Sequence, residues 1–237
     1  MESTQPLTPI REQITQIREC LPDRVRLIAV TKQVAVEAMR EAYAAGIRDF
    51  GESRLQEALP KQEQLRDCPD LCWHFIGHPQ SNKAQKILET FQWIHACDTL
   101  KLAQRLDRLA GELDLRPNVC LQVKIVSDPN KYGWSVPQLR AEMPLLNECK
   151  NIAIQGLMTI LPLGLSETDA LAAFQATRDL GSQIAAEDYP NLKMQEFSMG
   201  MSGDYPLAVR AGATMVRLGR TLFGERPRDR AEIAGKT

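Results

Sequence analysis

The regular alternation of short apolar runs with longer helical patterns is the feature that most constrains this chain. Eight runs have the length and composition of buried strands, at 26–31, 48–51, 73–77, 93–97, 119–125, 152–158, 195–199 and 214–219. The segments between them carry apolar residues at steps of three and four, such as Leu102, Leu106 and Leu109. Strands that alternate with helices predict an α/β protein with a parallel sheet. Their number favours a closed (β/α)8 TIM-type barrel, with an extra N-terminal helix at 9–21.

The chain reads as a single domain. Its 237 residues, 43% of them hydrophobic, are enough to bury a full core. No linker, repeat or low-complexity segment interrupts the alternation, and the stretch PLGLSETD at 162–169 reads as a loop. We therefore expect one domain over 1–237, with a barrel core at about 10–227 and a charged C-terminal tail at 228–237.

Charge and hydropathy exclude several classes of partner. Lys and Arg number 29 against 30 for Asp and Glu, so there is no bulk attraction to nucleic acid or to an anionic membrane surface. The N-terminal sequence has neither the basic nor the apolar region of a signal peptide, and no stretch approaches 18 uncharged apolar residues. We expect a cytoplasmic monomer that binds neither nucleic acid nor membranes.

The cysteines and histidines do not predict a metal site. Six cysteines are scattered along the chain, and only Cys68 and Cys72 are close together. No second Cys or His pair at zinc-site spacing completes a tetrahedral set, and the three histidines lack the HExxH arrangement. We expect reduced, structural thiols.

In a barrel, functional residues lie in the loops that follow the carboxyl ends of the strands. Lys32 follows the first strand in the stretch RLIAVTKQ, and SMGMSGD (198–204) and RLGRT (217–221) lie at the ends of the last two strands. Loops after the seventh and eighth strands of barrels commonly bind phosphate through backbone N–H groups. Because barrel closure brings these loops beside the first strand, a phosphorylated aldehyde bound there would present its carbonyl to the Lys32 amine.

That arrangement predicts pyridoxal 5′-phosphate (PLP) bound to Lys32 as a Schiff base, an internal aldimine. Arg217, just before the second glycine-rich turn, is placed to face the pyridine nitrogen of the ring. A guanidinium only donates hydrogen bonds, so it favours the unprotonated ring, which is a weak electron sink. This predicts a weak catalyst of carbanion chemistry.

Several motifs in order resemble the pyridoxal phosphate homeostasis protein family of the YggS/PROSC type. They include FGESRLQE (50–57), WHFIGHPQSNK (73–83), NKYGW (130–134), FSMGMSGDYPLAV (197–209) and VRLGRTLFGERP (216–227). The resemblance spans about residues 10–227 and implies a barrel like the N-terminal domain of alanine racemase. It also implies PLP on Lys32, Arg217 near the pyridine nitrogen, and phosphate contacts from Ser202, Gly203, Gly219 and Arg220. Ser53, His78, Met158 and Ser198 are further candidates for the cofactor site.

The chain departs from the family pattern at three places. Ser53 and Arg54 stand where the family usually has Asn-Tyr, a variant that resembles the PipY branch. Pro79 stands where leucine is expected and removes a backbone donor beside His78. Arg220 stands where a small hydroxyl residue is common.

Each candidate also has a structural interpretation. Lys32 is alternatively a solvated lysine at a strand end, and Arg217 a buried arginine paired with Glu52 or Asp204. The loop serines and glycines are alternatively ordinary turn residues. His78 and His95 are more typical of hydrogen-bonded structural groups, and Met158 of packing.

Two functions remain open. One is a carrier that holds PLP on Lys32, takes part in vitamin B6 homeostasis and transfers PLP transiently to PLP-dependent enzymes. The other is an amino-acid racemase of the alanine racemase type, which needs two bases on opposite faces of the substrate carbanion. Alanine racemase takes its tyrosine base from a second domain, and among the tyrosines here only Tyr132 and Tyr205 lie in suitable loops. We therefore favour the carrier. A serine hydrolase and a Rossmann dehydrogenase are disfavoured because GxSxG and GxGxxG are absent.

Overall fold

The computed structural model describes residues 9–224, and the predicted tail at 228–237 lies outside them. The strands are β1 Arg26–Val30, β2 Asp49–Glu52, β3 Cys72–Phe75, β4 Trp93–Cys97, β5 Asn118–Lys124, β6 Trp134–Ser135, β7 Ala153–Met158, β8 Leu192–Ser198 and β9 Met215–Leu218. The helices are α1 Ile10–Cys20, α2 Val36–Ala44, α3 Leu55–Gln64, the 3-10 helix η1 Ser81–Lys83, α4 Ala84–Thr90, α5 Leu100–Glu112, α6 Val136–Asn147, α7 Glu167–Ala185, α8 Tyr205–Arg210 and α9 Arg220–Phe223.

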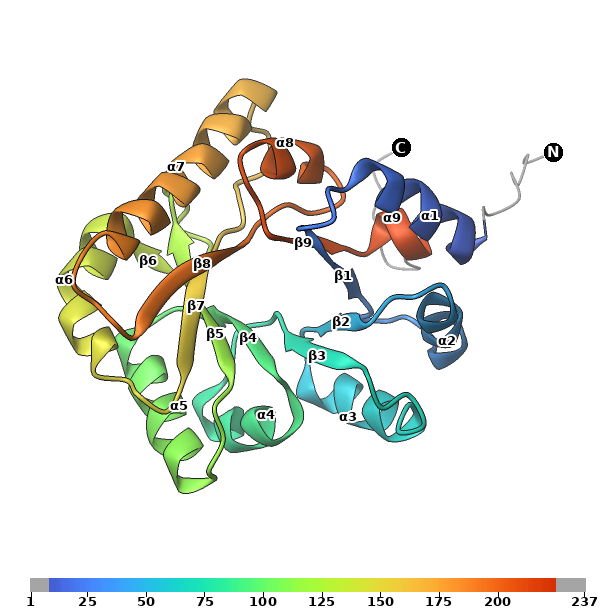
Figure 1. The fold of residues 1–237 in the computed structure, drawn as a ribbon, viewed down its shortest axis with the longest axis horizontal. Helices are drawn as coiled ribbons and strands as arrows, with labels where there is room; N and C mark the ends of the chain where they lie inside the picture. The colour runs from blue at the N-terminus through green and yellow to red at the C-terminus, as the bar shows by residue number, and fades with distance from the viewer. Residues whose placement is uncertain (1–8, 225–237) are drawn as a thin grey trace.

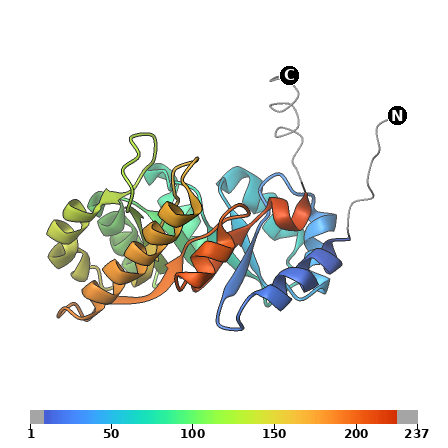
Figure 2. The same ribbon diagram turned by 90° about the horizontal axis from the view of Figure 1, so that it is seen from above.

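Eight of these strands close into a parallel barrel, as the alternation predicts (Figure 1). The order runs β4-β3-β2-β1-β9-β8-β7-β5, and the pairing of β4 with β5 closes the ring. Helices α2 to α8 surround the ring, and α1 lies beside α9 (Figures 1 and 2). Since every barrel strand runs in the same direction, all the carboxyl ends meet on one face of the barrel.

The structure differs from the predicted elements in small ways. The two-residue strand β6 pairs with β5 alone and lies outside the ring. Strand β8 begins at Leu192, three residues earlier than predicted. The short helix α9 follows Gly219 where the sequence suggested a turn. These differences concern elements too short, or too mixed in polarity, for periodicity to define.

The core has two layers. A large cluster fills the space between the strands and the surrounding helices, with fully buried residues such as Phe50 and Phe174. A smaller cluster comes from five different barrel strands and includes Ile28, Met158 and Met215. The strands therefore bury apolar side chains on both faces, as expected for a parallel sheet covered by helices. Within residues 9–224, no helix combines the length and the apolar character needed to span a bilayer.

Candidate functional site

A cavity of about 400 Å³ opens at the carboxyl ends of the strands. This volume lies in the range typical of small-molecule sites. Seven of the ten predicted cofactor-site residues line it: Lys32, Ser53, Ser202, Gly203, Arg217, Gly219 and Arg220. They come from the loops after β1, β2, β8 and β9, from β9 itself and from the start of α9. The barrel thus brings together residues that are up to 188 positions apart in the chain.

Lys32 lies in a tight turn between β1 and α2 and is half-buried. The turn is fixed on both sides, because Thr31 N–H donates to the Gly51 carbonyl (3.0 Å) and Val34 N–H donates to the Thr31 carbonyl (2.9 Å). Gln33 adopts a left-handed backbone conformation with φ of 59°. The backbone that carries the Lys32 side chain is therefore held by β1 and β2 together.

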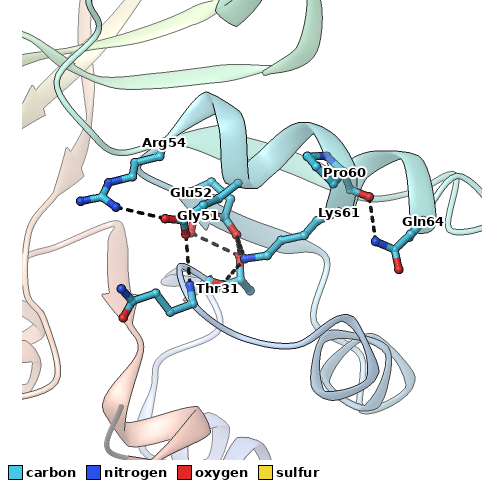
Figure 3. A network of polar contacts seen from close by, with 9 residues as sticks. Thr31, Gly51, Glu52, Arg54, Pro60, Lys61 and Gln64 are labelled. Atoms are coloured by element: carbon cyan, nitrogen blue, oxygen red, sulfur yellow. Dashed lines mark hydrogen bonds and ion pairs between the residues drawn. The ribbon is translucent and has the colours of Figure 1, made fainter. Parts of the chain in front are cut away.

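A buried ion pair supports this turn from behind (Figure 3). Lys61 Nζ, on α3, lies 2.7 Å from Glu52 Oε1 and donates a second hydrogen bond of 2.7 Å to the Thr31 carbonyl. Thr31 Oγ1 donates to the same Glu52 oxygen at 2.6 Å. Sequence pattern alone did not predict this pair, although a glutamate at the end of a barrel strand was a signal for it.

Burial raises the pKa of Glu52, while the hydrogen bonds from Lys61 and Thr31 lower it. Of its two oxygens, only Oε1 has hydrogen-bond partners among residues 9–224. A buried carboxylate held by one cation is stable only while that cation stays in place. The Lys61 side chain is itself only 12% exposed, so solvent screens the pair weakly.

Arg217 lies at the base of the cavity and is 4% exposed. Its Nη1 donates to Ser198 Oγ at 2.6 Å, and its Nη2 donates to the Thr159 carbonyl at 3.0 Å. Burial lowers its pKa to about 10. At neutral pH the guanidinium therefore remains charged.

The alternative ion pairs of Arg217 are not formed within the described chain. Glu52 pairs with Lys61, and Asp204 Oδ1 accepts from the backbone N–H of Met201 at 2.6 Å. Arg217 donates to two neutral oxygens. Because a guanidinium has about five N–H groups, others remain available to the cavity. The arrangement suits a ligand that accepts a hydrogen bond.

Two loops with unused backbone donors form another part of the cavity wall. Within residues 9–224, the backbone N–H groups of Ser202, Gly203 and Arg220 have no hydrogen-bond acceptor. Ser202 Oγ accepts from Thr221 N–H at 3.3 Å and so links the two loops. Gly200, with φ of 93°, makes the turn that begins the first of them. Several N–H donors around one concavity form a suitable site for an anion such as phosphate.

Ser53 reaches the cavity because of a close backbone contact. A Cβ on Gly77 would lie 2.2 Å from the Ser53 carbonyl oxygen, so only glycine fits where these two loops meet. The neighbouring Arg54 lies 3.3 Å from Glu57 and is exposed. At this departure from the family pattern, only Ser53 lines the cavity.

Three predicted site residues do not line the cavity. His78 is exposed, lies 2.8 Å from Asp98 Oδ2 and stacks on Tyr132 with ring centroids 4.1 Å apart. Met158 packs in the smaller core cluster. Ser198 is fully buried, and its hydroxyl oxygen accepts a hydrogen bond from Arg217.

The loop after β7 forms an apolar wall that the sequence analysis treated only as a connection. Its residues Ile160, Leu161, Pro162, Leu163, Gly164 and Leu165 all line the cavity. Lys131 Nζ donates to the Leu161 carbonyl and holds this loop. The position of this loop after a barrel strand was the sequence feature that could have indicated its place in the site.

The residues present fit PLP. The cavity offers a primary amine at Lys32, a hydrogen-bond donor at Arg217, free backbone donors for a phosphate, and an apolar wall for a ring. Its titratable side chains within residues 9–224 are Lys32, Glu167, Asp204, Arg217 and Arg220, with no histidine or tyrosine among them.

Comparison with known proteins agrees with this geometry. Residues 7–227 match the family described as alanine racemase, N-terminal domain. A Synechocystis protein named pyridoxal phosphate homeostasis protein is 51% identical over 212 residues, which cover 90% of this chain and 96% of that protein. An Escherichia coli K12 protein of the same name is 35% identical and covers 86% of this chain and 87% of its own.

Solved structures show the same fold. The structure of PipY from Synechococcus elongatus with PLP bound superposes with a TM-score of 0.87 at 50% identity, and covers 91% of this chain and 100% of PipY. Alanine racemase from Clostridium difficile superposes with a TM-score of 0.70 at 16% identity, over 95% of this chain and 60% of the racemase. The second comparison concerns the fold alone.

Proposed function

The chain belongs to the pyridoxal phosphate homeostasis protein family, and we propose that it carries PLP as a Schiff base on Lys32 and acts in vitamin B6 homeostasis. One observation carries this proposal: Lys32, Arg217 and the unused backbone donors of the last two loops line a single cavity. The solved PipY structure, at 50% identity, has PLP bound.

Each part of the cavity has a proposed role. The Lys32 amine would hold PLP covalently, because PLP supplies an aldehyde with which a primary amine forms one C=N bond and releases one water. Ser202, Gly203, Gly219 and Arg220 hold the phosphate, largely through backbone groups. Arg217 would donate a hydrogen bond to the pyridine nitrogen, and Ser53 lines the same cavity.

We further propose that the bound cofactor undergoes no catalytic turnover. A charged guanidinium facing the pyridine nitrogen does not protonate the ring, which keeps it a weak electron sink. Racemisation needs a second base opposite the lysine, and no tyrosine or histidine is among the described residues that line the cavity. Tyr132 stacks on His78, and Tyr205 begins α8, so neither is placed as that base.

The wider role follows from chemistry. A reactive aldehyde held as a Schiff base is protected, and hydrolysis of the C=N bond releases it again. We propose that the protein works as a cytoplasmic monomer and passes PLP to PLP-dependent enzymes by transient contact. Size measurements at working concentration, and the rate at which an apo-enzyme gains PLP from this protein compared with free PLP, test these two points.

Borohydride reduction of the PLP-loaded protein, followed by peptide mapping, tests the central proposal. The reduced cofactor is expected on Lys32, and modification of a different lysine would overturn the assignment. Lys32→Ala is expected to abolish the visible absorbance of bound PLP, whereas Lys86→Ala, at an exposed position on α4 outside the cavity, leaves it. Racemisation of alanine by the loaded protein at ordinary enzymatic rates would contradict the carrier role.

A further inference from the structure

A chain of hydrogen bonds crosses the interior of the barrel behind Arg217. Arg217 Nη1 contacts Ser198 Oγ (2.6 Å), and Ser198 Oγ contacts His95 Nδ1 (2.7 Å). His95 Nε2 contacts His74 Nδ1 (2.9 Å), and His74 Nε2 contacts Asp49 Oδ1 (2.9 Å). The five residues come from β9, β8, β4, β3 and β2.

This chain of hydrogen bonds is almost entirely shielded from water. Ser198, His95 and His74 are fully buried, and Arg217 is 4% exposed. Only the Asp49 side chain, at the start of β2, has moderate exposure, at 20%. The chain therefore runs from the cavity toward the opposite end of the barrel, where Asp49 meets solvent.

The two ends of the chain fix its direction. Arginine can only donate hydrogen bonds, and an ionised carboxylate can only accept them. A second cation, Arg26, lies 3.8 Å from the Asp49 carboxylate. Because a hydroxyl has a single hydrogen to donate and each neutral imidazole has one donor and one acceptor, only one arrangement satisfies every contact.

In that arrangement every hydrogen bond points the same way. Arg217 donates to Ser198, whose hydroxyl donates to His95 Nδ1. His95 donates through Nε2 to His74 Nδ1, and His74 donates through Nε2 to Asp49. Burial lowers the pKa of both histidines, which agrees with neutral rings.

We propose that Asp49, His74, His95 and Ser198 are positioning residues that together orient Arg217 toward the cavity and fix both histidines as the Nε2–H tautomer. This inference rests on the proposed function only in its second part, where Arg217 meets the pyridine nitrogen of PLP. Its first part concerns the hydrogen-bond direction within the protein and holds without a ligand.

The side chain of Cys72 also lies at the Asp49 end. Its sulfur, Asp49 and His74 place one ligand atom each within 4.8 Å of one another. The Arg26 cation beside Asp49 opposes a second positive charge there, and burial raises the pKa of Cys72 to about 12, so its thiol stays protonated. The charge of Arg26 and the protonated thiol of Cys72 thus favour the hydrogen bond from His74 to Asp49 over a metal ion at this place.

NMR of the ligand-free protein with isotope-labelled histidine tests the first part. Spectra recorded with EDTA present are expected to show His74 and His95 as neutral Nε2–H tautomers with Nδ1 accepting a hydrogen bond. The exposed His78 serves as an internal reference. A proton on Nδ1 of either buried ring overturns the proposed direction, whether or not the protein binds PLP.

Two matched variants test the second part. Ser198→Ala removes the hydroxyl in the chain, whereas Thr177→Val removes an equally buried hydroxyl on α7, which donates to the Ala173 carbonyl and does not line the cavity. Ser198→Ala is expected to weaken PLP binding about tenfold and to shift the visible absorbance of bound PLP, as loss of one oriented hydrogen bond would do.

Thr177→Val is expected to leave both readouts near those of the unmodified protein. Equal effects of the two variants would overturn the positioning role. Should Ser198→Ala fail to fold, the tautomers of the unmodified protein still decide the first part. Absence of PLP on Lys32 in the unmodified protein would instead contradict the proposed function, without bearing on the tautomers.

Discussion

Lys61 Nζ lies 2.7 Å from Glu52 Oε1 in the interior beside the β1–α2 turn. The same ammonium group holds the carbonyl of Thr31, the residue before Lys32. Glu52 ends β2 and Lys61 lies on α3. The Lys61 ammonium group therefore joins these two elements to the turn that carries the proposed PLP-binding amine (Figure 3).

Removal of the cation should destabilise the protein strongly. Lys61→Met is expected to lower the free energy of unfolding by about 3–5 kcal/mol, because it leaves the buried Glu52 carboxylate without a cationic partner. The double variant Glu52→Gln with Lys61→Met should recover part of that loss, since the amide carries no charge and its oxygen still accepts from Thr31. Urea denaturation measures both.

Lys86→Met provides the control for that experiment. The Lys86–Glu89 pair is exposed, with side-chain exposures of 52% and 33%, and its loss should cost less than about 1 kcal/mol. Similar losses for Lys61→Met and Lys86→Met would show that burial of the Glu52–Lys61 pair has no energetic role.

Gly77 should not tolerate a side chain. In Gly77→Ala, the new Cβ would meet the Ser53 carbonyl at 2.2 Å, which forces the two loops apart at a cost of about 1–3 kcal/mol. Gly203→Ala is the matched change, because a Cβ there would meet no atom within 4 Å, and it should cost under about 0.5 kcal/mol. Thermal unfolding compares the two, and equal stability would refute the close contact.

Ser202 should contribute to PLP affinity through its hydroxyl. Ser202→Ala removes the acceptor of Thr221 N–H and one polar group of the proposed phosphate site, so the Kd for PLP should rise about tenfold. Ser202→Thr keeps the hydroxyl and should bind within about threefold of the unmodified protein. Equilibrium dialysis gives both values. An unchanged Kd for Ser202→Ala would remove this residue from the site.

The two buried histidines should make stability depend on pH. Burial lowers the pKa of His74 and His95 in the folded protein, so below about pH 6.5 the unfolded chain binds more protons than the folded one. Stability should therefore be full above that pH and decrease as the pH falls toward the folded-state pKa values. The slope reaches at most about 1.4 kcal/mol per pH unit for each histidine.

Urea denaturation between about pH 5 and pH 7 measures this slope. His95→Gln removes one titrating ring, and it should reduce the slope even though it lowers stability at neutral pH. An equal slope in the unmodified protein and in His95→Gln would contradict the assignment to His95.

Much of this protein can be predicted from local sequence pattern. Short apolar runs, separated by segments with apolar residues at steps of three and four, placed the barrel strands within a few residues of their observed bounds, and the number of runs indicated the closed barrel. The parallel direction of the strands then put Lys32, Ser202 and Gly219 on one face without any knowledge of their contacts.

The contacts that organise the site could not be predicted in this way. Glu52 and Lys61 meet because α3 packs back against β2, and Arg217 meets Ser198 rather than Glu52 because both lie inside the barrel. His78 shares a barrel face with Lys32 but points to Asp98 and Tyr132 instead. Sequence spacing contains no information on such pairings.

The sequence by itself thus determined which residues end strands, and with that the location of the amine and the glycine-rich loops. Only the tertiary structure decided how Arg217 is held, because its chain of contacts joins residues from five strands that span positions 49 to 217. The physical reason is that periodicity reports which face of an element is buried, whereas hydrogen-bond direction depends on which polar groups the closed barrel brings face to face.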